Sequence, residues 1–140
     1  MRKYLSLFTA LILLGSCAND SLNSETKSLE LKQNLELKVN ECVSNNSISM
    51  CVDSVYNDSR CPMDVICVWQ GNAAVAVSFT LNETVHHLTL NTGNTPSLPS
   101  DTTIQQFKIS LNELAPYPIS SSTIAQEDYR ISLKVEELED

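Results

Sequence analysis

Hydrophobic side chains fall at every second position in several short segments after residue 28, and this alternation restricts the chain to strands with one buried face. The pattern is clearest in 35–39, 48–52 and 129–135, where apolar residues alternate with polar ones. Asparagine, serine and proline, which favour turns, lie between the segments. We therefore predict about seven strands, which include 29–39, 48–56, 73–81, 84–90, 104–111 and 129–138.

This pattern predicts an all-β domain over residues 29–140, a single β-sandwich of immunoglobulin-like general architecture. Uneven strand lengths and the long 91–101 connection favour the sandwich over a small barrel, which is the alternative. Leucine, glutamate and lysine would also suit a helix over 29–39, but the strict alternation over 35–39 favours a strand. The residues predicted to face the core in the last two strands are Phe107, Ile109, Leu111, Tyr129, Ile131, Leu133 and Val135.

The first sixteen residues have the features of an export signal. Arg2 and Lys3 precede an apolar run from Leu5 to Leu14, which is too short to span a bilayer because that requires about 20 apolar residues. Small residues and a cysteine follow, as Leu14-Gly15-Ser16-Cys17. An ordinary signal peptide that leaves Cys17 as a free thiol is one interpretation.

The same tetrad resembles the bacterial lipobox, which favours a second interpretation. The resemblance implies that residues 1–16 are removed and that Cys17 is acylated, so that the protein contacts the membrane through its lipid. The polar residues 18–28 then form a flexible tether. Localisation would be the bacterial cell envelope. Ala18 after the acylated cysteine favours the outer membrane over the inner one under the enterobacterial sorting rule.

Removing Cys17 from the count leaves four cysteines, an even number in an exported chain. Cys42 and Cys51 flank the turn-forming residues 44–47, so a hairpin would place them opposite each other. Cys61 and Cys67 close a short loop that contains proline. We predict disulfides 42–51 and 61–67. A zinc or redox site is disfavoured, because the spacings lack the Cys-x-x-Cys motif.

The segment from Asp58 to Gly71 holds the second cysteine pair and the single tryptophan. If the segment leads into a strand, Trp69 and Cys67 share a face, and we expect Trp69 to lie in the core. Arg60 is expected to act as a fork-shaped donor that ties loop carbonyls to an aspartate such as Asp58. The alternative is that Arg60 binds a ligand.

Charge and the missing motifs limit the possible functions. Residues 18–140 contain seven basic and seventeen acidic side chains, a formal charge of −10, which disfavours binding to nucleic acid or to an anionic membrane surface. Hydrolase, zinc-protease, phosphate-loop and calcium-loop motifs are absent from the sequence. His86 and His87 are adjacent, so a strand would direct them to opposite faces. We predict no cofactor, no metal and no catalytic residue.

Two short motifs resemble a group of exported bacterial proteins and lipoproteins. They are Asp58-Ser59-Arg60-Cys61-Pro62 and Cys67-Val68-Trp69-x-Gly71, followed by an apolar strand and a final strand that begins with tyrosine. The resemblance implies a small, secreted, disulfide-stapled β-domain. The group has no established activity, so the resemblance assigns no functional residue.

These features predict a non-enzymatic binding or accessory module of the envelope, whose partner is an unknown envelope protein or ligand. A small secreted enzyme or inhibitor that acts through the loops near Arg60 and 91–101 is the alternative, and a purely structural role is a third possibility. A concave pocket beside Arg60 with polar walls would favour the alternative. A flat, filled surface would favour the binding module.

Overall fold

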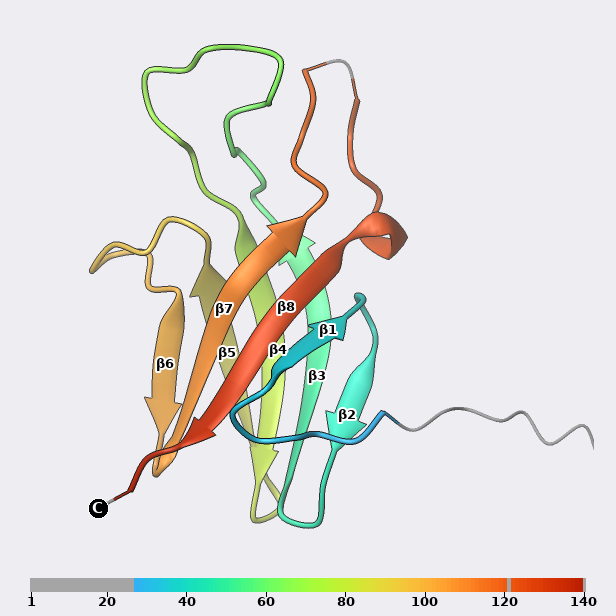
Figure 1. The fold of residues 1–140 in the computed structure, drawn as a ribbon, viewed down its shortest axis with the longest axis vertical. Helices are drawn as coiled ribbons and strands as arrows, with labels where there is room; N and C mark the ends of the chain where they lie inside the picture. Colours follow the sequence, from blue (N-terminus) through green and yellow to red (C-terminus); the bar gives the residue numbers. More distant parts are fainter. Residues whose placement is uncertain (1–26, 121, 140) are drawn as a thin grey trace, which may run out of the picture.

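Two antiparallel sheets of four strands each face one another in the computed structural model, which describes residues 27–120 and 122–139. The first sheet has the order β1-β8-β7-β6 and the second β2-β3-β4-β5 (Figure 1). The strands are β1 (Asn34–Leu37), β2 (Cys42–Ser44), β3 (Ile48–Tyr56), β4 (Ala74–Leu81), β5 (Thr84–Asn91), β6 (Asp101–Ile104), β7 (Phe107–Ala115) and β8 (Arg130–Glu137). The predicted all-β sandwich is confirmed, and the barrel alternative is wrong because the sheets do not close.

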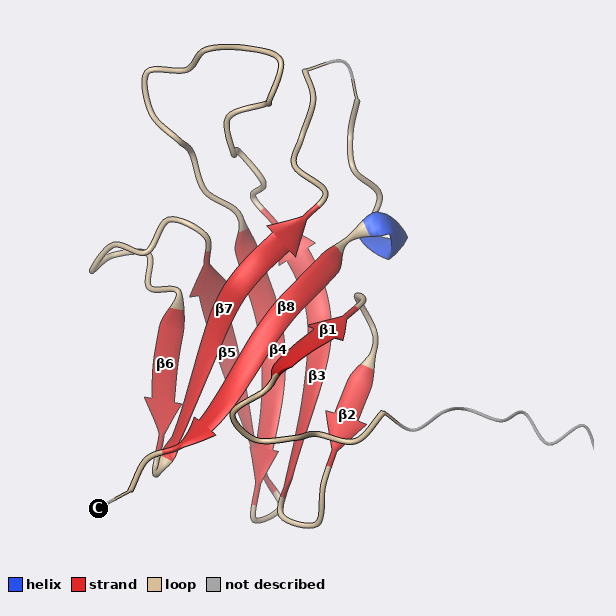
Figure 2. Ribbon diagram, in the orientation of Figure 1, coloured by secondary structure: helices blue, strands red, loops and turns tan. Residues whose placement is uncertain are grey.

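Figure 2 shows how little helix there is: the described ranges contain one short 3₁₀ helix, η1 (Gln126–Asp128). No helix among these residues is long and apolar enough to cross a membrane. Cys17 and the segment 1–26 lie outside the described residues, so the predicted signal peptide, acylation and most of the tether stay predictions.

The core is one cluster formed by the inner faces of both sheets. The alternation in the sequence sets these faces, because successive side chains of a strand point to opposite sides. In β8, Ile131, Leu133 and Val135 are fully buried, and Tyr129 just before it is buried too. Phe79 of β4 packs against Phe107 of β7 across the two sheets, with ring centroids 6.1 Å apart. The predicted core residues of the last two segments are all buried.

Two details differ from the prediction of about seven strands. The segment 104–111 is not one strand: Ile104 ends β6 and Phe107 begins β7, with Gln105 at φ 53° in the turn between them. A two-residue turn preserves the alternation of apolar side chains, so the pattern concealed the hairpin. The other difference lies in 29–39, where only Asn34–Leu37 forms a strand, although Leu29 is buried.

Tight hairpins form one end of the sandwich. Cys42 and Cys51 are directly opposite in β2 and β3, and the predicted disulfide joins them. Asn82 and Glu83 connect β4 to β5, both at positive φ, as a two-residue hairpin turn requires. The opposite end of the sandwich carries the three longer connections, 57–73, 92–100 and 116–129. We call it the loop end (Figure 1).

Candidate functional site

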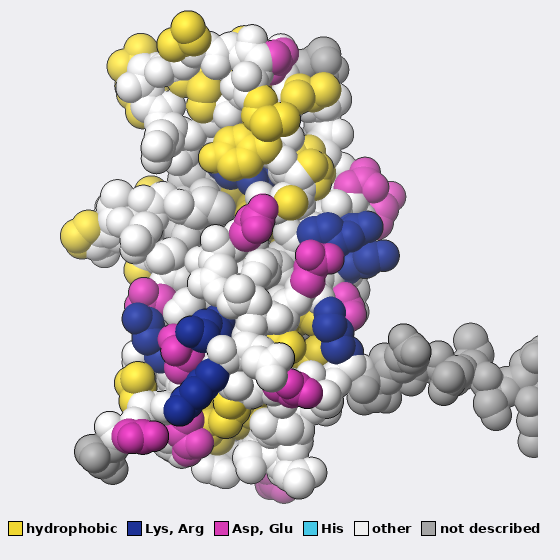
Figure 3. Space-filling view, viewed as in Figure 1, with side chains coloured by type: hydrophobic (Ala, Val, Ile, Leu, Met, Phe, Trp, Pro, Cys, Tyr) yellow, Lys and Arg dark blue, Asp and Glu magenta, His cyan; other side chains and the backbone are white. Residues whose placement is uncertain are grey.

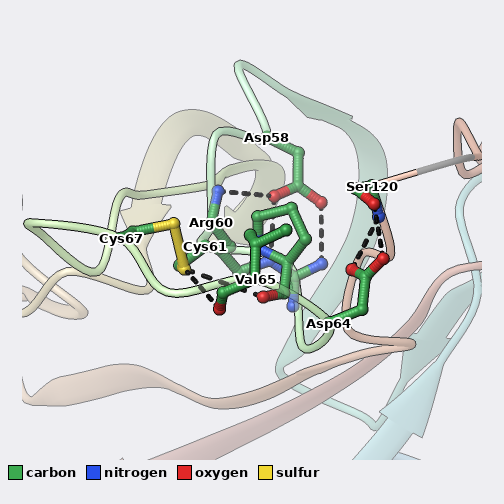
Figure 4. Close-up of a disulfide and its surroundings, with 8 residues drawn as sticks. Asp58, Arg60, Cys61, Asp64, Val65, Cys67 and Ser120 are labelled. Atoms are coloured by element: carbon green, nitrogen blue, oxygen red, sulfur yellow. Dashed lines mark hydrogen bonds and ion pairs between the residues drawn. A yellow bond between two sulfur atoms is a disulfide. The ribbon is translucent and has the colours of Figure 1, made fainter.

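The Arg60 guanidinium forms the centre of the loop end and is buried, with 4% of the residue exposed. Its Nε donates to Asp58 Oδ1 over 2.9 Å and its Nη2 to Asp58 Oδ2 over 2.7 Å. Figure 4 shows the two side chains face to face. Such a bidentate contact matches the planar geometry of the guanidinium and the carboxylate, and it is among the strongest ion pairs in proteins.

The same guanidinium joins two other segments. Nη1 donates to the carbonyl oxygen of Leu114 in β7 over 2.5 Å, and Nη2 to that of Pro116 over 2.9 Å. The Tyr117 ring covers the guanidinium at 4.8 Å from its centroid, a cation–π contact. Most donors of Arg60 are therefore used within the protein. Of the two roles considered for Arg60 and Asp58, loop organisation accounts for these contacts.

Tyr129 completes this cluster, because its hydroxyl donates to Asp58 Oδ2 over 2.9 Å. Burial alone would raise the pKa of Asp58, but the hydrogen bonds from Arg60 and Tyr129 outweigh it and hold the pKa below its usual value. Burial and the bond to Asp58 raise the pKa of Tyr129 from 10.0 to about 12. The sequence predicted a core position for Tyr129 but not this polar role. A buried tyrosine usually has a hydrogen-bond partner for its hydroxyl, so the predicted burial of Tyr129 was the one sequence signal that pointed to such a bond.

The 61–71 segment projects beyond this cluster as a stapled loop. The predicted disulfide joins Cys61 to Cys67. Backbone bonds from Ser59 to Asn72 (2.7 Å) and from Cys61 to Gln70 (2.8 Å) close its stem. Gly71 completes the stem at φ 71°, where an added Cβ would lie 1.8 Å from the Ser59 carbonyl oxygen. Only glycine fits this position.

A second contact holds the stapled loop against the β7–β8 connection. The backbone N–H of Ser120 donates to Asp64 Oδ1 over 2.8 Å, and the Ser120 hydroxyl donates to Oδ2 (Figure 4). The two Ser120 bonds lower the pKa of Asp64. Met63 N–H also donates to the Pro118 carbonyl over 3.0 Å. The two connections therefore support one another beyond the sandwich.

The stapled loop exposes a group of large apolar side chains, which we call the apolar tip. Ile66 and Val68 are fully exposed, and Trp69 is 77% exposed. The members are Met63, Val65, Ile66, Val68 and Trp69. Figure 3 shows apolar side chains gathered at the loop end, with charged groups concentrated on the body of the sandwich.

The core position predicted for Trp69 is therefore wrong. Residues 57–73 form no strand, and the disulfide curls 61–67 into a closed turn. The period-two rule, which would have put Cys67 and Trp69 on a buried face, applies only to extended chain. The apolar strand that follows begins at Ala74, after the stem has closed.

A pocket of about 500 Å³ opens beside Arg60, between the 92–100 connection and the end of β7. Leu111, Leu114, Ala115 and Tyr117 contribute to its walls. The remaining lining side chains are polar, namely Asn91, Thr92, Asn94, Ser100, Asn112 and Glu113. This is the concave polar surface that the sequence analysis associated with a ligand site in these loops.

Another polar group lies on the outer face of the second sheet. The Ser78 hydroxyl donates to Asp53 over 2.7 Å and lies 3.1 Å from His87 Nδ1. Serine stands between the acid and the histidine, whereas in a catalytic triad the histidine stands in the middle, so this order does not activate the serine. Neighbouring His86 pairs with a different β4 residue, Phe79, while His87 pairs with Ser78. Within the described ranges, no three histidine, cysteine or acidic residues are placed to hold a metal.

Comparison with known proteins gives no relative: no protein-family model, curated protein or solved structure matches the chain. The resemblance of the Asp58–Gly71 motifs to exported bacterial proteins stays a prediction.

Arg60→Ala is expected to lower the free energy of unfolding by about 3–5 kcal/mol, because it removes the charged partner of the Asp58 carboxylate and the donor to two carbonyl groups. Urea unfolding with the disulfides intact measures this loss. Arg130→Ala is the matched control, since within the described part of the chain the Arg130 side chain donates only to carbonyls of residues 127–129 around η1. Equal losses in the two variants would contradict a central role for Arg60.

Tyr129 is expected to ionise at about pH 12 in the folded protein, and the stability that it contributes has a defined pH window. Its pKa is raised on folding, so this contribution is complete below pH 10 and is lost as the pH rises from about 10 to about 12. Absorbance titration of tyrosinate, combined with unfolding at each pH, measures both effects. Tyr129→Phe should remove the step near pH 12, whereas Tyr56→Phe should leave it in place.

Proposed function

We propose that the protein is a lipid-anchored, non-enzymatic binding module of the bacterial cell envelope that presents the apolar tip to a partner protein. The lipobox-like tetrad ending at Cys17 and the polar segment 18–28 support the anchor. The observation that carries the binding role is the exposed and firmly held apolar tip. Monomeric soluble proteins rarely expose contiguous apolar patches larger than a few hundred Å², and a group of large exposed apolar side chains on one loop favours an interaction site.

The point where the chain enters the fold supports an outward orientation of the tip. Leu29 N–H bonds to the Ser44 carbonyl at the hairpin end, and Ser44 pairs with Ser49. From Ser49 to Tyr56 the strand rises about 23 Å toward the loop end at 3.3 Å per residue. An acylated Cys17 would therefore reach the fold from its hairpin end, which favours a tip that points away from the membrane.

The chemistry of the tip indicates the kind of partner. Ile66, Val68 and Trp69 can enter an apolar groove, and tryptophan is a frequent source of binding energy at interfaces. The Cys61–Cys67 disulfide and the Arg60 cluster hold the loop in advance, which lowers the entropy cost of association. The domain carries a strong negative charge, so the rim of the partner's groove is neutral or basic.

The enzyme or inhibitor alternative has one observation in its favour, the polar pocket beside Arg60. Its lining includes Glu113 and the buried Arg60 but no serine–histidine or cysteine–histidine pair. This composition suits recognition of a ligand better than catalysis. The pocket is therefore considered below as a binding site.

The anchor is tested by labelling cells with palmitate. We expect the wild-type chain to incorporate label and Cys17→Ala to incorporate none, because acylation requires the cysteine thiol. Cys61→Ala with Cys67→Ala controls for nonspecific loss of a cysteine and should retain the label. Equal labelling of wild type and Cys17→Ala would end the lipoprotein proposal.

The partner is tested by placing a photoreactive amino acid at position 66 in the full chain, in its native cells. We expect one protein adduct from position 66 and none from position 85, an exposed valine of β5 on the body of the sandwich. Trp69→Ser in the same chain should reduce the adduct, because the apolar contact is lost. An adduct with lipid alone, an adduct of twice the chain's mass, or equal adducts from both positions would contradict the proposal.

A further inference from the structure

We infer that the pocket beside Arg60 is a binding site for a neutral, hydroxyl-rich ligand of the saccharide class. Its volume of about 500 Å³ falls within the range of small-molecule sites, which is about 300–1,000 Å³. The inference goes beyond the proposed function and does not depend on it, because the apolar tip contributes no residue to the pocket lining.

The pocket walls combine carboxamides and hydroxyls. Asn91, Asn94 and Asn112 carry carboxamides, and Thr92 and Ser100 carry hydroxyls. The Asn91 amide and the Thr92 hydroxyl already bond within the protein, and Asn112 donates to Asn34 Oδ1 over 2.7 Å. Sugar hydroxyl groups likewise donate and accept at each position, so these walls match a sugar better than they match an apolar ligand. Within the described residues, the side chains of Asn94 and Ser100 make no hydrogen bond that a ligand would have to break.

The charges of the pocket argue against an anionic ligand. Arg60 lies in the wall, but Asp58 neutralises it at 2.7 Å and carbonyl groups occupy further donors. Glu113 is the remaining charged side chain of the lining, and it is exposed. A carboxylate or phosphate would therefore meet a negative group without a free cation to offset it. A neutral ligand can use Glu113 as a hydrogen-bond acceptor.

One aromatic side chain gives the pocket a rigid apolar surface. The guanidinium of Arg60 lies 4.8 Å from the centroid of the Tyr117 ring, which fixes that ring while half of the residue remains exposed. A sugar ring presents C–H groups on one face, and an aromatic ring is a suitable surface for them. Tyrosine supplies such contact at a low entropy cost because it has few rotatable bonds.

The back of the pocket is held in place before any ligand binds. Asn72 donates to Asn91 Oδ1 over 2.9 Å and accepts from Gly93 N–H over 2.9 Å. Asn91 in turn donates to the Pro99 carbonyl over 3.3 Å. These bonds fix the 92–100 connection against the stem of the stapled loop. A preformed site loses less entropy on binding.

The pocket is arranged for binding rather than for cleavage of a glycan. Glycoside hydrolysis generally uses two carboxyl groups on opposite sides of the scissile bond. Glu113 is the one carboxylate in this lining. The pocket would therefore bind and release the saccharide without cleaving it.

Isothermal titration calorimetry on the full chain, in a detergent without a sugar headgroup, tests the inference. The probes are cellotetraose and maltotetraose as plain hexose chains, chitotetraose as an N-acetylated chain of the cell-wall type, and tetragalacturonate as an anionic chain. We expect saturable binding of at least one neutral probe. Binding by chitotetraose alone would indicate a wall glycan, and binding by the glucose chains would indicate another polysaccharide.

Two matched variants locate the site. Asn94 has φ 44° and Asn82, in the β4–β5 turn at the other end of the sandwich, has φ 48°, so glycine suits both backbones. We expect Asn94→Gly to weaken binding about fivefold, the loss of one hydrogen bond, and Asn82→Gly to leave it unchanged. Tetragalacturonate should bind at least about tenfold more weakly than the neutral probe, and Glu113→Gln should narrow that gap.

Three outcomes would overturn the inference. They are no saturable heat from any neutral probe up to about 10 mM, tighter binding of tetragalacturonate than of the neutral chains, and equal affinity in Asn94→Gly and wild type. Ile66→Ser in the apolar tip should leave saccharide binding unchanged. The saccharide proposal and the partner proposal can therefore be refuted independently of each other.

Discussion

The buried contact between Asp58 and Arg60 is the interaction on which the loop end depends. Both residues follow β3 of one sheet. Leu114, which bonds to Arg60, belongs to β7 of the other sheet, and Tyr129, which bonds to Asp58, directly precedes β8 of that sheet. A buried ion pair stabilises a fold only when its remaining donors and acceptors are satisfied. Here they are: within the described residues, every buried side-chain nitrogen and oxygen has a partner. The cluster closes the sandwich where a hydrophobic core alone would leave the loops unsupported.

This closure separates two surfaces of different chemistry. The stapled loop projects beyond the cluster and exposes apolar side chains, while the polar pocket lies beside it, between the 92–100 connection and β7. Arg60 contributes to the support of both without facing solvent. Because Asp58 neutralises the charge of Arg60, neither surface gains a net positive charge from this arginine. The two proposed binding activities therefore share one scaffold but use different side chains.

Local sequence patterns predicted what depends on neighbouring residues along the chain. The alternation placed the buried faces of β3, β7 and β8, and the turn at 44–47 predicted the Cys42–Cys51 pair. Trp69 was misplaced because the disulfide turn ends the alternation on which that prediction relied. The Tyr129–Asp58 bond joins residues 71 positions apart, and the pocket is formed by two connections and a strand end. Such long-range contacts depend on topology, which the sequence pattern alone does not provide.

The stem of the stapled loop has a consequence for how this protein can diversify. Ser59, Asn72 and Gly71 close the stem, and the sandwich below needs only that closure. The side chains of Ile66 and Val68 point to solvent and contribute nothing to the core. Substitutions at these two positions, unlike substitutions at Asp64, which binds Ser120, can therefore accumulate without affecting the folding of the domain. The stapled loop can therefore vary in its exposed side chains while the sandwich stays the same, and related chains could change their binding specificity by changing a few residues there.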